Sequence, residues 1–136
     1  MKERQARTRF AGSRVARLAT VRPDGAPHLV PVVFALDGDV VWLVIDEKPK
    51  RGRALQRLAN VRSEPRVSLL VDRYDEDWKR LWWVRVDGRA RVVEEGPELD
   101  HALGLIVERY PQERESPPRG PAVAVAIERW RWWPKG

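Results

Sequence analysis

Four basic side chains stand close together in the first half of the sequence, where an apolar run ends and a helical pattern begins. They are Lys48, Lys50, Arg51 and Arg53. Cations at the start of a helix oppose the helix dipole, so an empty site disfavours them there. A bound phosphate removes that conflict, because Arg supplies bidentate contacts and Lys a point charge. The alternative is a solvated helix start, and composition alone does not decide between the two.

Other side chains that commonly carry chemistry are few. The chain has no cysteine and only two histidines, His28 and His101, so a zinc or non-haem iron site lacks ligands. His28 is either an ordinary half-buried strand residue or a hydrogen-bonding partner for a ring or a substrate carbonyl. The acidic run 75–77 lacks the glycine and the spacing of a calcium loop. We therefore assign no metal ligand and no catalytic residue.

Composition indicates a globular chain whose positive charge suits nucleic acid, an anionic membrane or a phosphorylated small ligand. The 136 residues are 43% hydrophobic and 34% charged, which suits a single domain over residues 1–136. No apolar run approaches the roughly 20 residues of a membrane span, and the N-terminus lacks a signal-peptide pattern. With the absence of cysteine, these features favour a cytoplasmic protein that contacts no membrane. The net charge of +6 is spread through the chain, which disfavours nucleic acid as a partner.

Hydrophobic patterns predict the elements that must position these residues. Strands are expected over residues 15–21, 26–36, 40–46, 66–72, 81–94 and 121–130. Helices are expected over residues 1–14, 51–60 and 97–110, with loops over 75–80 and 111–120 and a Trp-rich tail after residue 130. Six strands without regular strand–helix alternation indicate a mainly β (α+β) fold, an antiparallel barrel with peripheral helices.

Turn residues and prolines predict how some strands are arranged. The turn signals at 23–25 and 37–38 favour an antiparallel meander of the first three strands. Pro27 and Pro31 cannot donate to a ladder, so the second strand is expected at a sheet edge or bulged. The dipeptide 87–88 is either a turn or a bulge within one long bent strand.

Seven tryptophans are unusual in a chain of this size. Trp82 and Trp83 are adjacent and should point to opposite faces of a strand, one toward the core and one toward a partner or pocket. Arginines and tryptophans share the segment 129–133, where Arg–Trp stacking and a nucleic-acid platform are both open interpretations.

Four segments in order carry a resemblance to a known family. They are ARLATVRPDGAPHLVPVVFAL, DVVWLVIDEKPKRGRAL, EPRVSLLVDRYDEDW and WWVRVDGRARVVE. Together they resemble the pyridoxamine 5′-phosphate oxidase-like split β-barrel superfamily, and most closely its branch of oxidoreductases that use the deazaflavin coenzyme F420. The resemblance implies a six-stranded, Greek-key-like barrel of the FMN-binding split-barrel type. It also implies a homodimer with its cofactors at the subunit interface.

The resemblance further implies which residues hold the cofactor. The phosphate would lie at Lys48, Lys50, Arg51 and Arg53, and the ring near His28, Val30, Pro31, Val32, Val44 and Trp78, the last often from the partner chain. Relatives often carry polar residues where this chain has Val30 and Pro31, so backbone groups would have to bind the ring here. The expected reaction is hydride transfer between F420 and an electron-poor small molecule. The alternatives are an FMN-dependent oxidoreductase, a non-enzymatic flavin or deazaflavin carrier, and a nucleic-acid-binding module.

Overall fold

The computed structural model describes residues 1–45 and 51–135 of the chain. Its strands are β1 (Ala16–Val21), β2 (Pro27–Val32), β3 (Ala35–Asp37), β4 (Val40–Val44), β5 (Arg66–Arg73), β6 (Trp82–Val93) and β7 (Ala122–Trp133). Its helices are α1 (Glu3–Gly12), α2 (Arg51–Ser63), α3 (Pro97–Arg109) and α4 (Gln112–Glu115). No helix in this part of the chain is long and apolar enough to cross a membrane.

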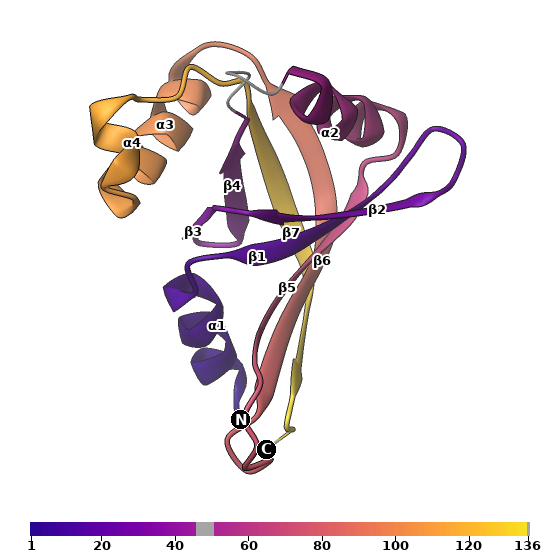
Figure 1. Ribbon diagram of the computed structural model, residues 1–136, viewed down its shortest axis with the longest axis vertical. Coiled ribbons are helices and arrows are strands. Elements are labelled where there is room, and N and C mark those ends of the chain that lie inside the picture. The colour runs from indigo at the N-terminus through magenta and orange to yellow at the C-terminus, as the bar shows by residue number, and fades with distance from the viewer. Residues whose placement is uncertain (46–50, 136) are drawn as a thin grey trace.

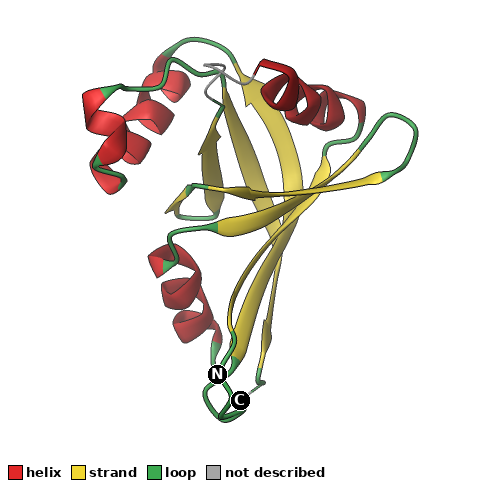
Figure 2. Cartoon of the chain, viewed as in Figure 1, coloured by secondary structure: helices red, strands yellow, loops and turns green. Residues whose placement is uncertain are grey.

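All the strands belong to one antiparallel sheet that curls into a split barrel. The strand order is β2-β1-β5-β6-β7-β4-β3, with seven strands rather than the six expected. The long strand β6 pairs with β5 on one side and with β7 on the other. The curled sheet is surrounded by helices, with α2 at one end of the molecule and the tip of the β5–β6 hairpin at the other (Figures 1 and 2). The predicted barrel with peripheral helices is confirmed.

The extra strand comes from a break in the strand predicted over residues 26–36. Phe34 donates its N–H to the hydroxyl of Tyr110 at 3.1 Å, and the same hydroxyl lies 2.8 Å from the carbonyl oxygen of Phe34. The backbone of Phe34 therefore forms hydrogen bonds with the side chain of Tyr110, which is distant in sequence, instead of with a neighbouring strand. Both hairpins of the predicted meander are present, because β2 pairs with β1 and β3 pairs with β4. The break at Phe34 separates them, so the three predicted strands do not form one continuous meander, and β4 also pairs with β7.

Other predictions meet mixed outcomes. Pro27 and Pro31 lie on the edge strand β2, as expected. β6 is one continuous strand with a bulge between Asp87 and Gly88, so the bulge interpretation is confirmed. A Cβ atom on Gly88 would lie 2.3 Å from the carbonyl oxygen of Ala126, which explains the glycine. The predicted tail is wrong, because β7 stays paired with β6 through Trp133, and the loop after α3 contains α4.

The interior of the barrel is filled by one face of each strand. Alternate residues of β1, β5 and β6 are buried, and valine and leucine dominate these rows. Helix α1 adds Phe10, which is fully buried and whose ring centroid lies 4.9 Å from that of Phe34 and 5.6 Å from that of Trp130. The guanidinium of Arg7 lies 4.6 Å from the ring centroid of Trp130. Trp130 therefore does stack with an arginine, but that arginine comes from α1 and not from Arg129 or Arg131 of the predicted segment.

Replacing Tyr110 with phenylalanine tests the break between β2 and β3. We expect Tyr110→Phe to lower the free energy of unfolding by about 1–3 kcal/mol, because buried backbone groups of Phe34 lose their partner. Urea denaturation measures the change. Tyr74→Phe is the matched control, since that ring is 64% exposed. A Tyr110→Phe protein as stable as the parent would show that the hydroxyl contributes nothing to the break.

Candidate functional site

The edge strand β2 presents different side chains to the two faces of the sheet. His28, Val30 and Val32 pair with Thr20, Leu18 and Ala16 of β1, whose side chains are buried. Val32 is itself buried, and Val30 packs against the core. These two valines are thus part of the barrel interior, and only their backbone atoms are available to a ligand on the outer face.

The outer face of β2 carries an exposed apolar row of Pro27, Leu29 and Pro31. Leu29 is 67% exposed, and both prolines are also exposed. The row lies beside Ala19 and Val21 of β1, which are half-buried. A flat, apolar strip on a strand with a free edge offers a surface for an aromatic ring and backbone groups for the polar rim of that ring.

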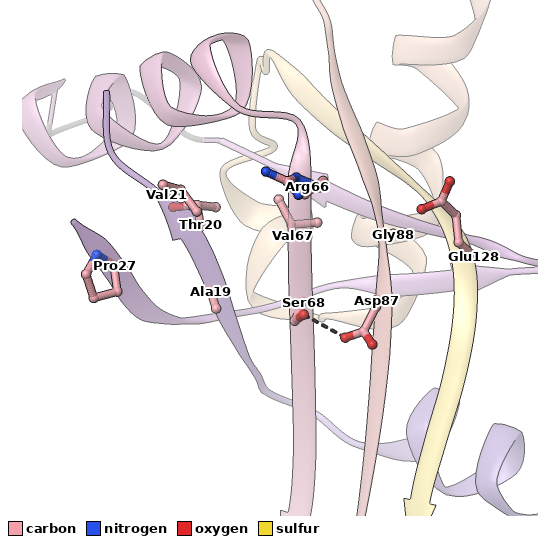
Figure 3. Close-up of a pocket in the computed structure, with 10 residues that line it drawn as sticks. All are labelled: Ala19, Thr20, Val21, Pro27, Arg66, Val67, Ser68, Asp87, Gly88 and Glu128. Carbon is pink, nitrogen blue, oxygen red and sulfur yellow. Dashed lines mark hydrogen bonds between the residues drawn. The ribbon is translucent and has the colours of Figure 1, made fainter. Parts of the chain in front are cut away.

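A shallow pocket of about 430 Å³ begins at Pro27 and extends across β1, β5, β6 and β7 (Figure 3). Its lining is Ala19, Thr20, Val21, Pro27, Arg66, Val67, Ser68, Asp87, Gly88 and Glu128. Ser68 donates its hydroxyl to Asp87 at 2.7 Å, and Arg85 donates Nε–H to the same carboxylate oxygen at 3.0 Å. Ser68 and Arg85 thus hold the carboxylate of Asp87 in a fixed position at the pocket.

A chain of buried amide and hydroxyl groups joins α2 to β1 on the other side of the strand. Asn60 is fully buried and donates Nδ2–H to Thr20 Oγ1 at 3.0 Å. Gln56 donates Nε2–H to Asn60 Oδ1 at 2.7 Å. Sequence reasoning missed these residues. A signal for them exists in the sequence, because each is a polar residue among apolar ones. Thr20 continues the alternating row of Ala16 and Leu18, and Asn60 lies between Leu58 and Val61.

His28 lies beside this polar chain, because it is the register partner of Thr20. Its Nδ1 atom is buried and has no hydrogen-bond partner among the residues that the structure describes, and the same is true of Nε of Arg57 on α2. Burial, and then the positive charges of Arg22 and Arg57, lowers the pKa of His28. Burial also lowers the pKa of the Arg57 guanidinium.

The remaining residues that were expected to hold a cofactor either lie apart from one another or fall outside the residues that the structure describes. Val44 ends β4 and packs against the clusters under α3. Trp78 is 72% exposed in the loop between β5 and β6, at the end of the molecule away from α2 (Figure 1). Lys48 and Lys50 lie outside the described residues, and so do the side chains of Arg51 and Arg53. The structure therefore groups His28, Val30, Pro31 and Val32 on one strand, with Trp78 far from them in the same chain.

Comparison with known proteins places the chain in a family. Residues 3–134 match the family described as pyridoxamine 5′-phosphate oxidase. The chain belongs to this family. No curated protein is similar enough in sequence to count as a match.

Solved structures of other proteins share the fold of this pyridoxamine 5′-phosphate oxidase family member. A conserved hypothetical protein of Mycobacterium tuberculosis is 31% identical over 98% of this chain and 84% of its own, with a TM-score of 0.78. An FAD-binding protein of Mesorhizobium loti is 22% identical over 97% of this chain and 94% of its own, with a TM-score of 0.72. A haem storage protein of Vibrio cholerae is 16% identical over 98% of this chain and 94% of its own, with a TM-score of 0.72. The last two likenesses show the fold alone.

The lowered pKa of His28 predicts how stability depends on pH. The unfolded chain takes up a proton on His28 near the ordinary value of 6.5, whereas the folded chain does so at lower pH. The free energy of unfolding should therefore fall as the pH drops below about 6.5. The fall should end once the pH is below the folded-state pKa of His28.

Urea denaturation between about pH 7.5 and about pH 5 measures this slope. A His101→Gln background leaves His28 as the one remaining histidine, and adding His28→Gln should flatten the slope in this window. Equal slopes with and without His28 would contradict the prediction.

Proposed function

We propose that the chain is an oxidoreductase that binds the deazaflavin coenzyme F420 and exchanges a hydride between it and an electron-poor small molecule. The observation that supports this best is the exposed row of Pro27, Leu29 and Pro31 on a free strand edge, next to the pocket over β1 and β5, in a member of this family. When bound, the coenzyme supplies the hydride chemistry. The chain supplies an apolar wall, backbone hydrogen bonds from β2, and cations for the phosphate.

The cations of this proposal are Lys48, Lys50, Arg51 and Arg53. They follow β4 in the chain and lead into α2, where the first N–H groups of the helix have no intrahelical partner. A phosphate at this position would use both the side-chain charges and the helix N–H groups. FMN carries the same phosphate, so an FMN-dependent enzyme of this fold is the nearest alternative to the F420 enzyme.

A second copy of the chain completes the proposed site. The loop between β5 and β6, which contains Trp78, lies at the end of the molecule away from α2 (Figure 1). In this proposal Trp78 therefore reaches the cofactor from a partner chain. Leu29 and Trp133 are also large apolar side chains left exposed, at 67% and 42%. A homodimer that covers the outer face of the sheet would bury them and enclose the pocket.

Sedimentation velocity tests the dimer. We expect a dimer at tens of micromolar, roughly the range in which a stable interface persists. Leu29→Arg should shift the protein toward monomer without loss of folding, because the side chain is exposed. Gln112→Arg on α4 adds the same charge away from the sheet and should leave the dimer intact. A parent protein that sediments as a monomer would contradict the proposed assembly.

Coenzyme titration tests the redox proposal. F420 is expected to quench the tryptophan fluorescence at lower concentration than FMN does, and the reduced coenzyme should then be turned over with an electron-poor acceptor. Binding without turnover would favour the carrier alternative, and a preference for FMN would overturn the assignment to F420. Haemin belongs in the same titration, because a haem storage protein shares the fold.

A double variant locates the phosphate in this titration. Lys50→Ala with Arg51→Ala should weaken coenzyme binding by roughly two to four orders of magnitude, since each charge-assisted hydrogen bond contributes about 1.5–3 kcal/mol. Lys2→Ala with Arg4→Ala removes the same charge at the N-terminal end of α1 and should change little. Unaltered affinity in the Lys50/Arg51 variant would show that the phosphate binds elsewhere.

A further inference from the structure

We propose that a pocket between the C-terminal end of α2 and the edge of β6 binds a small carboxylate that carries an amide group and a short apolar side chain, as an N-acyl amino acid does. The C-terminal residue of a peptide has the same chemistry. The pocket lies at the opposite end of α2 from residues 51–53, and the proposal does not depend on redox activity.

The pocket has an apolar floor that belongs to the core of the barrel. Its volume is about 540 Å³, a usual size for a small-ligand site, and it lies where α2 meets the end of β6 (Figure 1). Val61 of α2 and Ala90 of β6 are buried core residues, and Val92 packs against them. Pro65 completes the floor, and its carbonyl oxygen accepts the N–H of Ala90 at 2.8 Å. This firmly held floor suits a short apolar side chain.

The strand edge beside the pocket offers backbone hydrogen-bonding groups. β5 begins at Arg66, opposite Arg89 of β6, so no strand of the described chain pairs with the next residues of β6 on this side. The N–H of Ala90 points to this side, because it donates to Pro65. Hydrogen-bonding groups alternate along an antiparallel strand, so the N–H and C=O of Val92 point there too. An amide group in the pocket would pair with both, as an added strand does.

Two guanidinium groups lie at the rim of the pocket. Arg91 donates from both Nη atoms to Glu98 on α3, and Arg62 of α2 pairs with Glu94. The side chains of Arg62 and Glu94 are 53% and 66% exposed. An ion pair this exposed contributes little to stability, so the fold loses little when a ligand carboxylate replaces Glu94 on Arg62. Glu94 thus occupies the position of the ligand carboxylate in the empty pocket.

N-acetyl-L-leucine is the probe, because it carries all three features in one small molecule. The backbone amide signals of the full-length protein are followed by NMR at constant ionic strength. We expect saturable shifts that are largest at Val61, Arg62, Ala90 and Val92. Shifts that do not saturate, or that are spread evenly over the basic surface of the protein, would overturn the proposal.

Three analogues each remove one feature of the probe. N-acetyl-L-leucinamide lacks the carboxylate and should bind at least about tenfold more weakly, the loss of one charge-assisted hydrogen bond. 4-Methylpentanoate lacks the amide, and N-acetylglycine lacks the apolar side chain, so both should also bind more weakly. Binding as tight as that of the probe by any of the three would overturn the proposal.

A longer ligand identifies the source of the carboxylate. N-acetyl-Ala-Ala-Leu carries the same C-terminal residue as the probe on a longer backbone. Binding at least as tight as that of N-acetyl-L-leucine supports the C-terminus of a peptide as the ligand. Weaker binding of the tripeptide supports a free N-acyl amino acid.

Variants of the rim pair should change the affinity for the probe in opposite directions. Arg62→Gln should weaken binding at least about tenfold. Glu94→Gln removes the internal competitor and should strengthen binding about two- to fivefold. Arg62→Lys should retain part of the affinity, and it replaces the glutamine variant in the test if that variant folds poorly.

Two control variants separate the pocket from general attraction to a basic protein. Arg4→Gln on α1 and Glu108→Gln on α3 make the same changes of charge at exposed positions away from the pocket, and both should bind the probe like the parent. Effects in the controls as large as those in the rim variants would overturn the proposal, and so would weaker binding by Glu94→Gln.

Discussion

The two edges of the sheet have to meet, and the rest of the structure depends on that closure. β2 and β3 stand at opposite ends of the strand order, yet only Val33 and Phe34 separate them in the chain. Three residue steps span at most about 11 Å, so the other strands must curl until the outer two are neighbours. The residue that makes this passage, Phe34, leaves both ladders, and Tyr110 from the end of α3 satisfies its backbone. Closure of the barrel is therefore coupled to the docking of α3.

Closure also decides where a ligand can bind. Curling places one face of each strand inside, and the inner rows of β1, β5 and β6 are occupied by leucine and valine that are almost completely buried. A cofactor as large as a flavin has no place among them. The outer face of β2, with Leu29 and the pocket, remains open to a ligand. His28, on the other face, lies beside the hydrogen bond between Thr20 and Asn60. The two faces of this edge strand thus differ: one is apolar and exposed, and on the other His28 is influenced by the positive charges of Arg22 and Arg57.

The local pattern of the sequence was enough for most of the fold but not for its long-range pairings. Alternation of apolar residues located the strands, and the prolines placed β2 at an edge. The break at Phe34 has no local signal, because its cause is a hydroxyl 76 residues away. The meander followed from turn signals that describe only neighbours in sequence, whereas β4 pairs with β7 near the end of the chain. The sequence left open whether residues 87–88 form a bulge or a turn. Choosing the bulge requires knowing that Ala126 lies against Gly88.

The site was less accessible to sequence reasoning, for a related reason. His28 was singled out, but as a ring contact, and its neighbours Arg57 and Asn60 drew no notice because they are one and two turns beyond the basic run. What makes them relevant is the hydrogen bond from Asn60 to Thr20, 40 residues apart in sequence. That bond joins α2 to β1, and Arg57 of the same helix is close enough to His28 for its charge to lower the pKa of His28. The position of Arg57 relative to β2 thus depends on this long-range contact, which a charge count over the same residues cannot show.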